Sequence, residues 1–261
     1  AKALCDDNTE VFDYSDKFIY PGFLESHAHG MFAGCRALGL ADVSAILPSD
    51  AEKYKAAIRE YMNQHPDSEG YAVAGWAEDG NPDINAAFLD EVCPEKPLIL
   101  NTGGGHSILL NTKAMEYFGV DSEFAKRWEP GLVRVDENGK PTGYICEAPC
   151  IEIMTSFKIL VEEAKEYLLW WQNFAFRNGY TGTSDAGAEL VNPIAVPAYA
   201  QLQKEGKLKL RTYAYMMVKD NLDDPKGKIE EIAQYAKENN GEYYQVIGAK
   251  AFLDGVLEAH T

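Results

Sequence analysis

The sequence lacks the features of a membrane-spanning or secreted protein. No apolar run in its 261 residues approaches the roughly 20 that a helix needs to cross a bilayer. The first ten residues, AKALCDDNTE, lack the basic start and apolar centre of a signal peptide. The five cysteines are an odd number without a CxxC spacing, which argues against a disulfide framework. A reducing, cytoplasmic location without a membrane partner is therefore expected.

Basic residues are also scarce. Lys and Arg total 24 against 41 Asp and Glu, which gives a formal net charge of −17. So few cations cannot neutralise a phosphate backbone, and we expect no nucleic-acid partner. Hydrophobic residues (46%) and charged residues (25%) occur at the levels of a folded globular protein. The length allows one large domain or two ordinary ones.

Motifs for nucleotide binding and nucleophilic catalysis are absent too. The sequence has no G-x-S-x-G elbow, Walker loop or dinucleotide fingerprint, and the glycines at 103–105 lack a following Lys. Cys35 and Cys93 have no neighbouring His that would make either a nucleophile. Cys146 and Cys150 lie four residues apart, but no second pair completes a metal site, so we interpret them as small, partly buried residues.

The sequence does contain an alternation of apolar strands and amphipathic helices. Ala164, Leu168 and Trp171 form one apolar stripe of a helix that ends at Asn178-Gly179. Such alternation indicates parallel βα units. The expected strands are 10–12, 19–26, 71–75, 98–101, 180–185, 208–217 and 244–253, and the expected helices are 51–64, 82–92, 161–178, 196–203 and 226–239.

Three local signals support these boundaries. Ser49 and Glu52 have the spacing of a capping box at the start of helix 51–64. Asp224 followed by Pro225 marks the start of helix 226–239. An Asn-Gly turn between two short apolar segments predicts a hairpin over 131–145.

The strongest chemical pattern is PGFLESHAHG at 21–30, in which an apolar strand leads into His27 and His29. Side chains at i and i+2 of a strand point to the same side. Two neutral imidazoles on one side can bind a divalent ion such as zinc. A bare HxH also occurs by chance in loops, and only the flanking residues make this one specific.

Lys250 is the second chemical candidate because it interrupts the apolar strand VIGAKAF. Burying an unpaired ammonium in such a strand is costly. An ion pair with Asp254 or Asp185 is one solution.

Six segments in order resemble the N-terminal part of the amidohydrolase superfamily, specifically amidohydrolase family 3, the YtcJ-like metal-dependent hydrolases. The resemblance covers nearly all of the chain. The matching segments are PGFLESHAHG (21–30), GWAEDG (75–80), GGHSILLNTKAM (104–115), GYICEA (143–148), GYTGTSDAG (179–187) and GAKAFLDG (248–255).

The resemblance implies an α/β fold, the first half of a (β/α)8 TIM-like barrel with a large insertion after strand one and remnants of a β-sandwich. Residues 1–20 would be the β-sandwich remnant. Residues 21–40 and 156–261 would form barrel strands one to four. Residues 41–155 would be the insertion subdomain over the active site, because barrel active sites lie at the carboxyl ends of the strands.

The resemblance also implies a metal site with His27, His29 and Lys250 as ligands and Glu147 as an outside candidate. Lys250 would react with CO2 to give an anionic carbamate that bridges one or two divalent ions, zinc in first place. For Glu147, a solvated hairpin end is the alternative.

His106, Trp76 and Asp185 would be substrate-binding residues in the same family. The alternatives are a locally bonded loop histidine for His106 and a core position for Trp76. No residue of the chain is assigned a catalytic role, because the family's later residues carry it.

The implied activity is hydrolysis of a non-peptide, amide-type C–N bond of a small molecule by a metal-activated water. The family pattern continues past Thr261 with two further His ligands and a catalytic Asp, so the chain is expected to be a truncated, inactive piece. The alternative is a non-catalytic barrel fragment that associates with itself, as a homo-oligomer, or with the missing half through open sheet edges.

Overall fold

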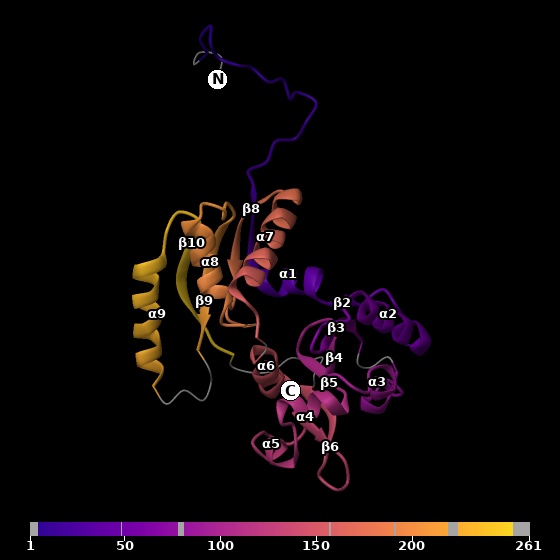
Figure 1. Cartoon of the computed structure of the whole chain (residues 1–261). Helices are drawn as coiled ribbons and strands as arrows, with labels where there is room; N and C mark the ends of the chain where they lie inside the picture. Colours follow the sequence, from indigo (N-terminus) through magenta and orange to yellow (C-terminus); the bar gives the residue numbers. More distant parts are fainter. Residues whose placement is uncertain are drawn as a thin grey trace.

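The computed structural model describes residues 5–47, 49–77, 81–156, 158–190, 192–218 and 224–252. Within these residues the chain forms two separate sheets that are accompanied by helices (Figure 1). One sheet has four strands in the order β1-β8-β9-β10, and the other has six in the order β2-β3-β4-β5-β7-β6. The chain therefore leaves the first sheet after one strand and returns to it only after completing the second.

Every strand pair in the four-stranded sheet is parallel, which confirms the βα units predicted from the sequence. The carboxyl ends of its four strands consequently lie side by side along one edge of the sheet, which we call the carboxyl edge. The elements of this part are β1 (Phe23–Ala28), α1 (Gly30–Gly39), α7 (Val161–Arg177), β8 (Tyr180–Asp185), α8 (Ala195–Lys204), β9 (Arg211–Met217), α9 (Pro225–Asn239) and β10 (Tyr244–Lys250).

The six-stranded sheet is mixed. Its first three strands are parallel, and β5, β7 and β6 add antiparallel pairs, including the predicted Asn-Gly hairpin between β6 and β7. The elements are β2 (Ala41–Asp42), α2 (Ala51–Gln64), β3 (Tyr71–Trp76), α3 (Ala86–Val92), β4 (Leu98–Thr102), β5 (Ser107–Leu110), α4 (Thr112–Phe118), α5 (Ser122–Lys126), β6 (Val133–Val135), β7 (Pro141–Cys146) and α6 (Glu147–Thr155).

The four-stranded sheet buries its residues unevenly. In β9, Thr212, Ala214 and Met216 are buried, while the alternating Tyr213 and Tyr215 are only half-buried. The buried face packs in one cluster with residues of α7 and α8. Parallel sheets are normally covered on both faces, so the second face of this sheet is unusually open.

The six-stranded sheet is covered on both faces. All five residues of β4 are buried. Leu98 and Leu100 belong to one apolar cluster with residues of α2 and α3, and Ile99 belongs to a second with residues of α4, α5 and α6. The side chain of Asn111 caps α4 and also accepts from the Leu98 backbone, which joins that helix to the sheet.

Helix α1 packs tightly on α7. A Cβ atom on Gly34 would lie 2.1 Å from the backbone oxygen of Tyr167, and one on Gly30 would lie 2.6 Å from the Trp171 ring. Only glycine permits this approach of the two helices. The start of α1, directly after His29, is thereby fixed against the rest of the first sheet.

Several sequence predictions are wrong in detail. Residues 5–22 form no strand, and in Figure 1 they extend away from both sheets, so the strand expected at 10–12 is not formed. Backbone hydrogen bonds within residues 5–17 are local turn contacts, such as Thr9 N–H to the Asp6 carbonyl and Lys17 N–H to the Tyr14 carbonyl. The β-sandwich remnant at 1–20 stays a prediction.

Helix α2 begins where predicted, but Asp50 is its N-cap instead of Ser49. The Asp50 carboxylate accepts from the Lys53 N–H, and Asp serves this position as well as Ser. Among the described residues, no helix is both long and apolar enough to cross a membrane.

Candidate metal centre

His27 and His29 lie together where β1 ends and α1 begins. His29 is the N-cap residue of α1, with φ −130° and ψ 79°. The two imidazole rings are 5.2 Å apart between centroids and nearly perpendicular, at 87°. Between them, Ala28 pairs with Asp185 of β8. The short HxH spacing thus places both imidazoles at the carboxyl edge of the parallel sheet.

His29 has an environment that keeps it neutral. Burial, together with the nearby charges of His27, Lys250 and His106, lowers the pKa of His29 to about 4. The imidazole is therefore uncharged at physiological pH, which is the form that binds a metal ion. Its Nδ1 atom is buried and has no hydrogen-bond partner among the described residues.

Asp185 pairs with Ala28, the residue between the two histidines, and is almost completely buried, at 1% exposure. Burial raises the pKa of Asp185 to about 7, against the opposing effect of hydrogen bonds from the Tyr199 hydroxyl and the Gly30 backbone N–H. The Tyr199 hydroxyl donates to Oδ2 at 2.8 Å. The carboxylate thus contacts the first residue of α1. No sequence motif pointed to Tyr199.

Lys250 is the last residue of β10, opposite Met217 of β9, and so lies at the same carboxyl edge. Its ammonium is 5.0 Å from the centroid of the Phe252 ring. Its charge acts on His29. Of the two acids considered as partners, Asp185 bonds Tyr199 instead, and Asp254 lies outside the described residues. Carboxylation of Lys250 stays a prediction.

His106 and Glu147 form a second pair, contributed by the six-stranded sheet. The His106 Nδ1 and Glu147 Oε2 atoms are 3.5 Å apart, and the Glu147 N–H donates to the His106 carbonyl at 2.8 Å. Glu147 has φ +55°, and no other non-glycine among the described residues has a positive φ. Strain of this kind is costly and often accompanies function. The charge of His106 also reaches His29, so the two pairs are close.

Trp76 ends β3 in the core of the second sheet. Its side chain is 4% exposed and packs edge-on against Tyr144, with ring centroids 6.3 Å apart. This position favours the core alternative over substrate contact. Its assignment to substrate binding stays a prediction.

Cys146 and Cys150 do not form a metal pair in this structure. Cys150 is fully buried in α6, and its Sγ lies 3.7 Å from the Met154 sulfur. Burial raises the pKa of the Cys150 thiol, which disfavours the thiolate that a metal requires. Both cysteines are buried, whereas the sequence predicted small, partly buried residues.

The residues at the carboxyl edge fit a divalent ion in part. His29 offers a neutral imidazole, and His27 stands beside it. The described residues contain no group of three or more His, Cys, Asp or Glu side chains that could hold a metal ion. The structure therefore places two candidate nitrogen ligands side by side, and no third His, Cys, Asp or Glu among the described residues joins them.

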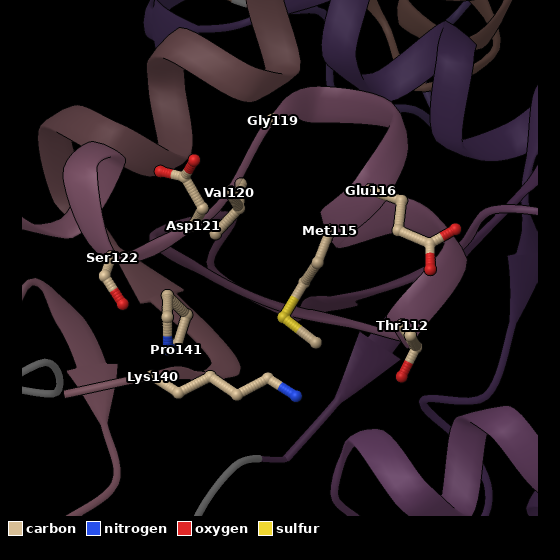
Figure 2. Close-up of a pocket in the computed structure, with 9 residues that line it drawn as sticks. All are labelled: Thr112, Met115, Glu116, Gly119, Val120, Asp121, Ser122, Lys140 and Pro141. Carbon is tan, nitrogen blue, oxygen red and sulfur yellow. The ribbon is translucent and has the colours of Figure 1, made fainter. Parts of the chain in front are cut away.

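Two cavities lie elsewhere in the molecule. One, of about 450 Å³, is lined by residues of α4, the start of α5 and the beginning of β7; Figure 2 shows the Lys140 side chain extending along it beside Met115. The other, of about 610 Å³, lies between the α1 and α7 helices and the second sheet. Neither cavity is lined by His27 or His29, so neither belongs to the histidine pair.

Comparison with known proteins identifies the class of protein to which this fold and histidine pair belong. The family model described as "Amidohydrolase family" matches residues 10–261, and the chain belongs to amidohydrolase family 3. Its mixed α/β fold is similar to that of an uncharacterized metal-dependent hydrolase from Pyrococcus horikoshii OT3, with a TM-score of 0.62 and 20% identity. That match covers 92% of this chain and 44% of the other.

Two further relatives are considerably longer than this chain. The chain is 26% identical to the putative amidohydrolase YtcJ of Bacillus subtilis, over 97% of this chain and 46% of the relative. It is also 26% identical to an N-substituted formamide deformylase of Arthrobacter pascens, over 77% of this chain and 38% of the relative. The chain thus spans about half the length of the relatives it matches.

Proposed function

We propose that this chain carries part of the metal site of a hydrolase that cleaves amide-type C–N bonds. The observation that carries the proposal is the pair His27 and His29, adjacent at the carboxyl end of a parallel strand, with His29 held neutral. A bound divalent ion, zinc in first place, supplies Lewis-acid activation of a carbonyl group and of the attacking water. The similarity to an N-substituted formamide deformylase supports a small amide as the substrate.

Each residue near the pair has a proposed part. His27 and His29 would bind the ion through imidazole nitrogens, and Lys250, as an anionic carbamate, would be a ligand of another kind. The proximity of its charge to His29 supports this assignment. His106 and Glu147 would contact the substrate from the facing sheet, with Glu147 as the alternative ligand. Asp185 is buried against the start of α1, a position that favours support of His29 over direct substrate contact.

We also propose that β1, β8, β9 and β10 are the first four strands of a (β/α)8 barrel. Parallel pairing, the order of the strands and the helices between them support this reading. The six-stranded sheet, inserted between β1 and β8, would then be a subdomain that covers the mouth of the barrel. Its His106 is close to His29, as such a position requires.

A second candidate function is association through the open sheet. Leu24 of β1 is 67% exposed and Ile247 of β10 is 51% exposed, at the two edge strands of the parallel sheet. Exposed apolar residues on unpaired edges favour pairing with a second copy or another chain. This function does not require a metal.

Elemental analysis after zinc loading and dialysis, together with an assay on an N-substituted formamide, tests the proposal. We expect the 261-residue chain to retain zinc weakly, below one equivalent, because a closed zinc site needs three or more protein ligands. We expect no hydrolysis by the chain alone. Two tightly held equivalents with measurable hydrolysis would show that other residues complete the site, and no zinc retention at any loading would favour the association function.

A further inference from the structure

Helix α1 has two opposite faces that contact different parts of the molecule. Gly30 and Gly34, four residues apart, face α7 at distances that only glycine permits. Phe32 and Arg36, also four residues apart, are about half a turn away from that face. They contact the loop at 103–106 of the six-stranded sheet. Figure 1 shows α1 between α7 and the strands β2 and β3.

Arg36 makes the polar part of this contact. Its Nε and Nη2 atoms are each 3.0 Å from Asp42 Oδ2, and its Nη1 donates to the Gly103 carbonyl at 3.4 Å. The other carboxylate oxygen of Asp42 accepts from the Ser44 N–H at 2.8 Å. The Arg36 side chain is 26% exposed, so this network is partly shielded from water. One guanidinium therefore joins α1, β2 and the loop.

Phe32 makes the apolar part. A Cβ atom on Gly105 would lie 3.2 Å from the Phe32 ring, and Gly105 has φ +77°. A side chain there would meet both the ring and a strained backbone. The loop thus lies directly on α1. Its next residue is His106, which is tied to Glu147.

We propose that Arg36 is a positioning residue that holds the 103–106 loop, and with it His106, over the His27–His29 pair. The helix that begins at His29 then also fixes the facing wall of the site, so both sides share one rigid element. This inference rests on the proposed function for its consequence in catalysis, whereas the positioning itself is independent of any metal. Arg36 lies outside all six segments that resemble the family, including the nearby segments 21–30 and 104–115.

Hydrogen exchange on the metal-free chain tests the positioning. The Gly103 N–H donates to the Trp76 carbonyl and the Gly105 N–H to the Thr102 carbonyl, so both amides report on loop order. With Arg36→Ala we expect exchange at these two amides to rise roughly tenfold, since a charge-assisted contact to the loop is lost. The imidazole ¹H–¹³C signal of His106 should shift toward that of a free histidine, while the His65 signal stays unchanged.

Three further variants make the test specific. Arg36→Lys keeps the charge but lacks the fork that reaches Asp42 and Gly103 together, so it should restore less than half of the protection. Asp42→Asn should reproduce part of the Arg36→Ala effect. Arg59→Ala on the exposed side of α2 is the control and should change nothing at 103–106.

Two outcomes would overturn the inference. Unchanged exchange and an unchanged His106 signal in Arg36→Ala would mean that Phe32 and the strand ends suffice to hold the loop. Equal acceleration across both sheets would mean that Arg36 serves stability in general. Zinc affinity, measured on the same variants, should change less than about threefold because His27 and His29 remain. If the unaltered chain bound no zinc, that result would count against the proposed function but would leave the positioning role of Arg36 intact.

Discussion

The two sheets differ in how completely they are covered. The six-stranded sheet has apolar clusters on both faces and buries all of β4. The four-stranded parallel sheet packs one face on α7 and α8, while Leu24 and Ile247 stay exposed at its edge strands. A sheet that closes its own core needs no partner, and an open parallel sheet gains by acquiring one. The candidate ligands His27, His29 and Lys250 lie on or directly after strands of the open sheet, whereas His106 and Glu147 adjoin strands of the covered sheet.

The largest expected effect comes from disturbing the helix layer of the open sheet. Gly34→Ala should lower the free energy of unfolding by about 3 kcal/mol, because its Cβ would meet the Tyr167 backbone and overpacking of a rigid contact is costly. Urea denaturation measures the change. Gly103→Ala is the control, since a Cβ there meets nothing within 4 Å. Hydrogen exchange should show greater loss of protection in β8 than in β4, and equal losses in both strands would mean that the Gly34 contact does not act mainly on the open sheet.

The sequence predicted the regular parts of both sheets. Helices α7 and α9 have clear apolar or capping signals, and the hairpin β6–β7 has its Asn-Gly turn. Helix α1 was not predicted, because its Gly and Ala residues give a weak periodic pattern and its stability comes from contact with α7.

From residue spacing alone, the candidate site was predictable only where its residues are close in sequence, and the assignment of Lys250 and His106 to it came from the family resemblance. The HxH spacing alone predicted that the His27 and His29 side chains lie close together, and their rings are 5.2 Å apart between centroids. The contacts of Arg36 with Gly103 and of Tyr199 with Asp185 join distant segments and have no local signal. Such contacts depend on how helices and sheets pack, which the pattern of a single segment does not contain.

The next largest effect concerns Asp185, the last residue of β8 in the open sheet. Its pKa is raised to about 7 in the folded chain, against an ordinary value of 3.8. The folded state therefore binds a proton that the unfolded state releases, so stability from this group is full below the unfolded pKa and falls as the pH rises toward 7.

Asp185→Asn should remove this dependence. Between pH 5.5 and pH 8, the stability of the variant relative to the unaltered chain should rise by about 2 kcal/mol, since each pKa unit corresponds to about 1.4 kcal/mol. Urea denaturation of both proteins at the two pH values gives the difference, in which the other acids cancel. A difference that stayed constant or fell with pH would mean that Asp185 is ionised in the folded chain.

The smallest effect on stability concerns the exposed edges. Leu24→Ser and Ile247→Ser should each change the free energy of unfolding by less than about 0.5 kcal/mol, because both side chains are already largely in water. They should nevertheless weaken self-association, as measured by analytical ultracentrifugation. Leu160→Ser is the control, since Leu160 is 73% exposed but precedes α7 outside either sheet. If the unaltered chain and all three variants associated equally, the open sheet would not be the association surface.

Zinc titration of the chain and of three histidine variants tests the central claim most directly. His27→Ala and His29→Ala should each weaken zinc binding by at least about 100-fold, because even loss of a ligand's hydrogen-bond partner costs about 10- to 100-fold. His65→Ala should bind zinc as the unaltered chain does, since His65 lies against the Tyr61 ring at the end of α2, with centroids 4.3 Å apart. Equal affinities in all four proteins would contradict the assignment of His27 and His29 as metal ligands.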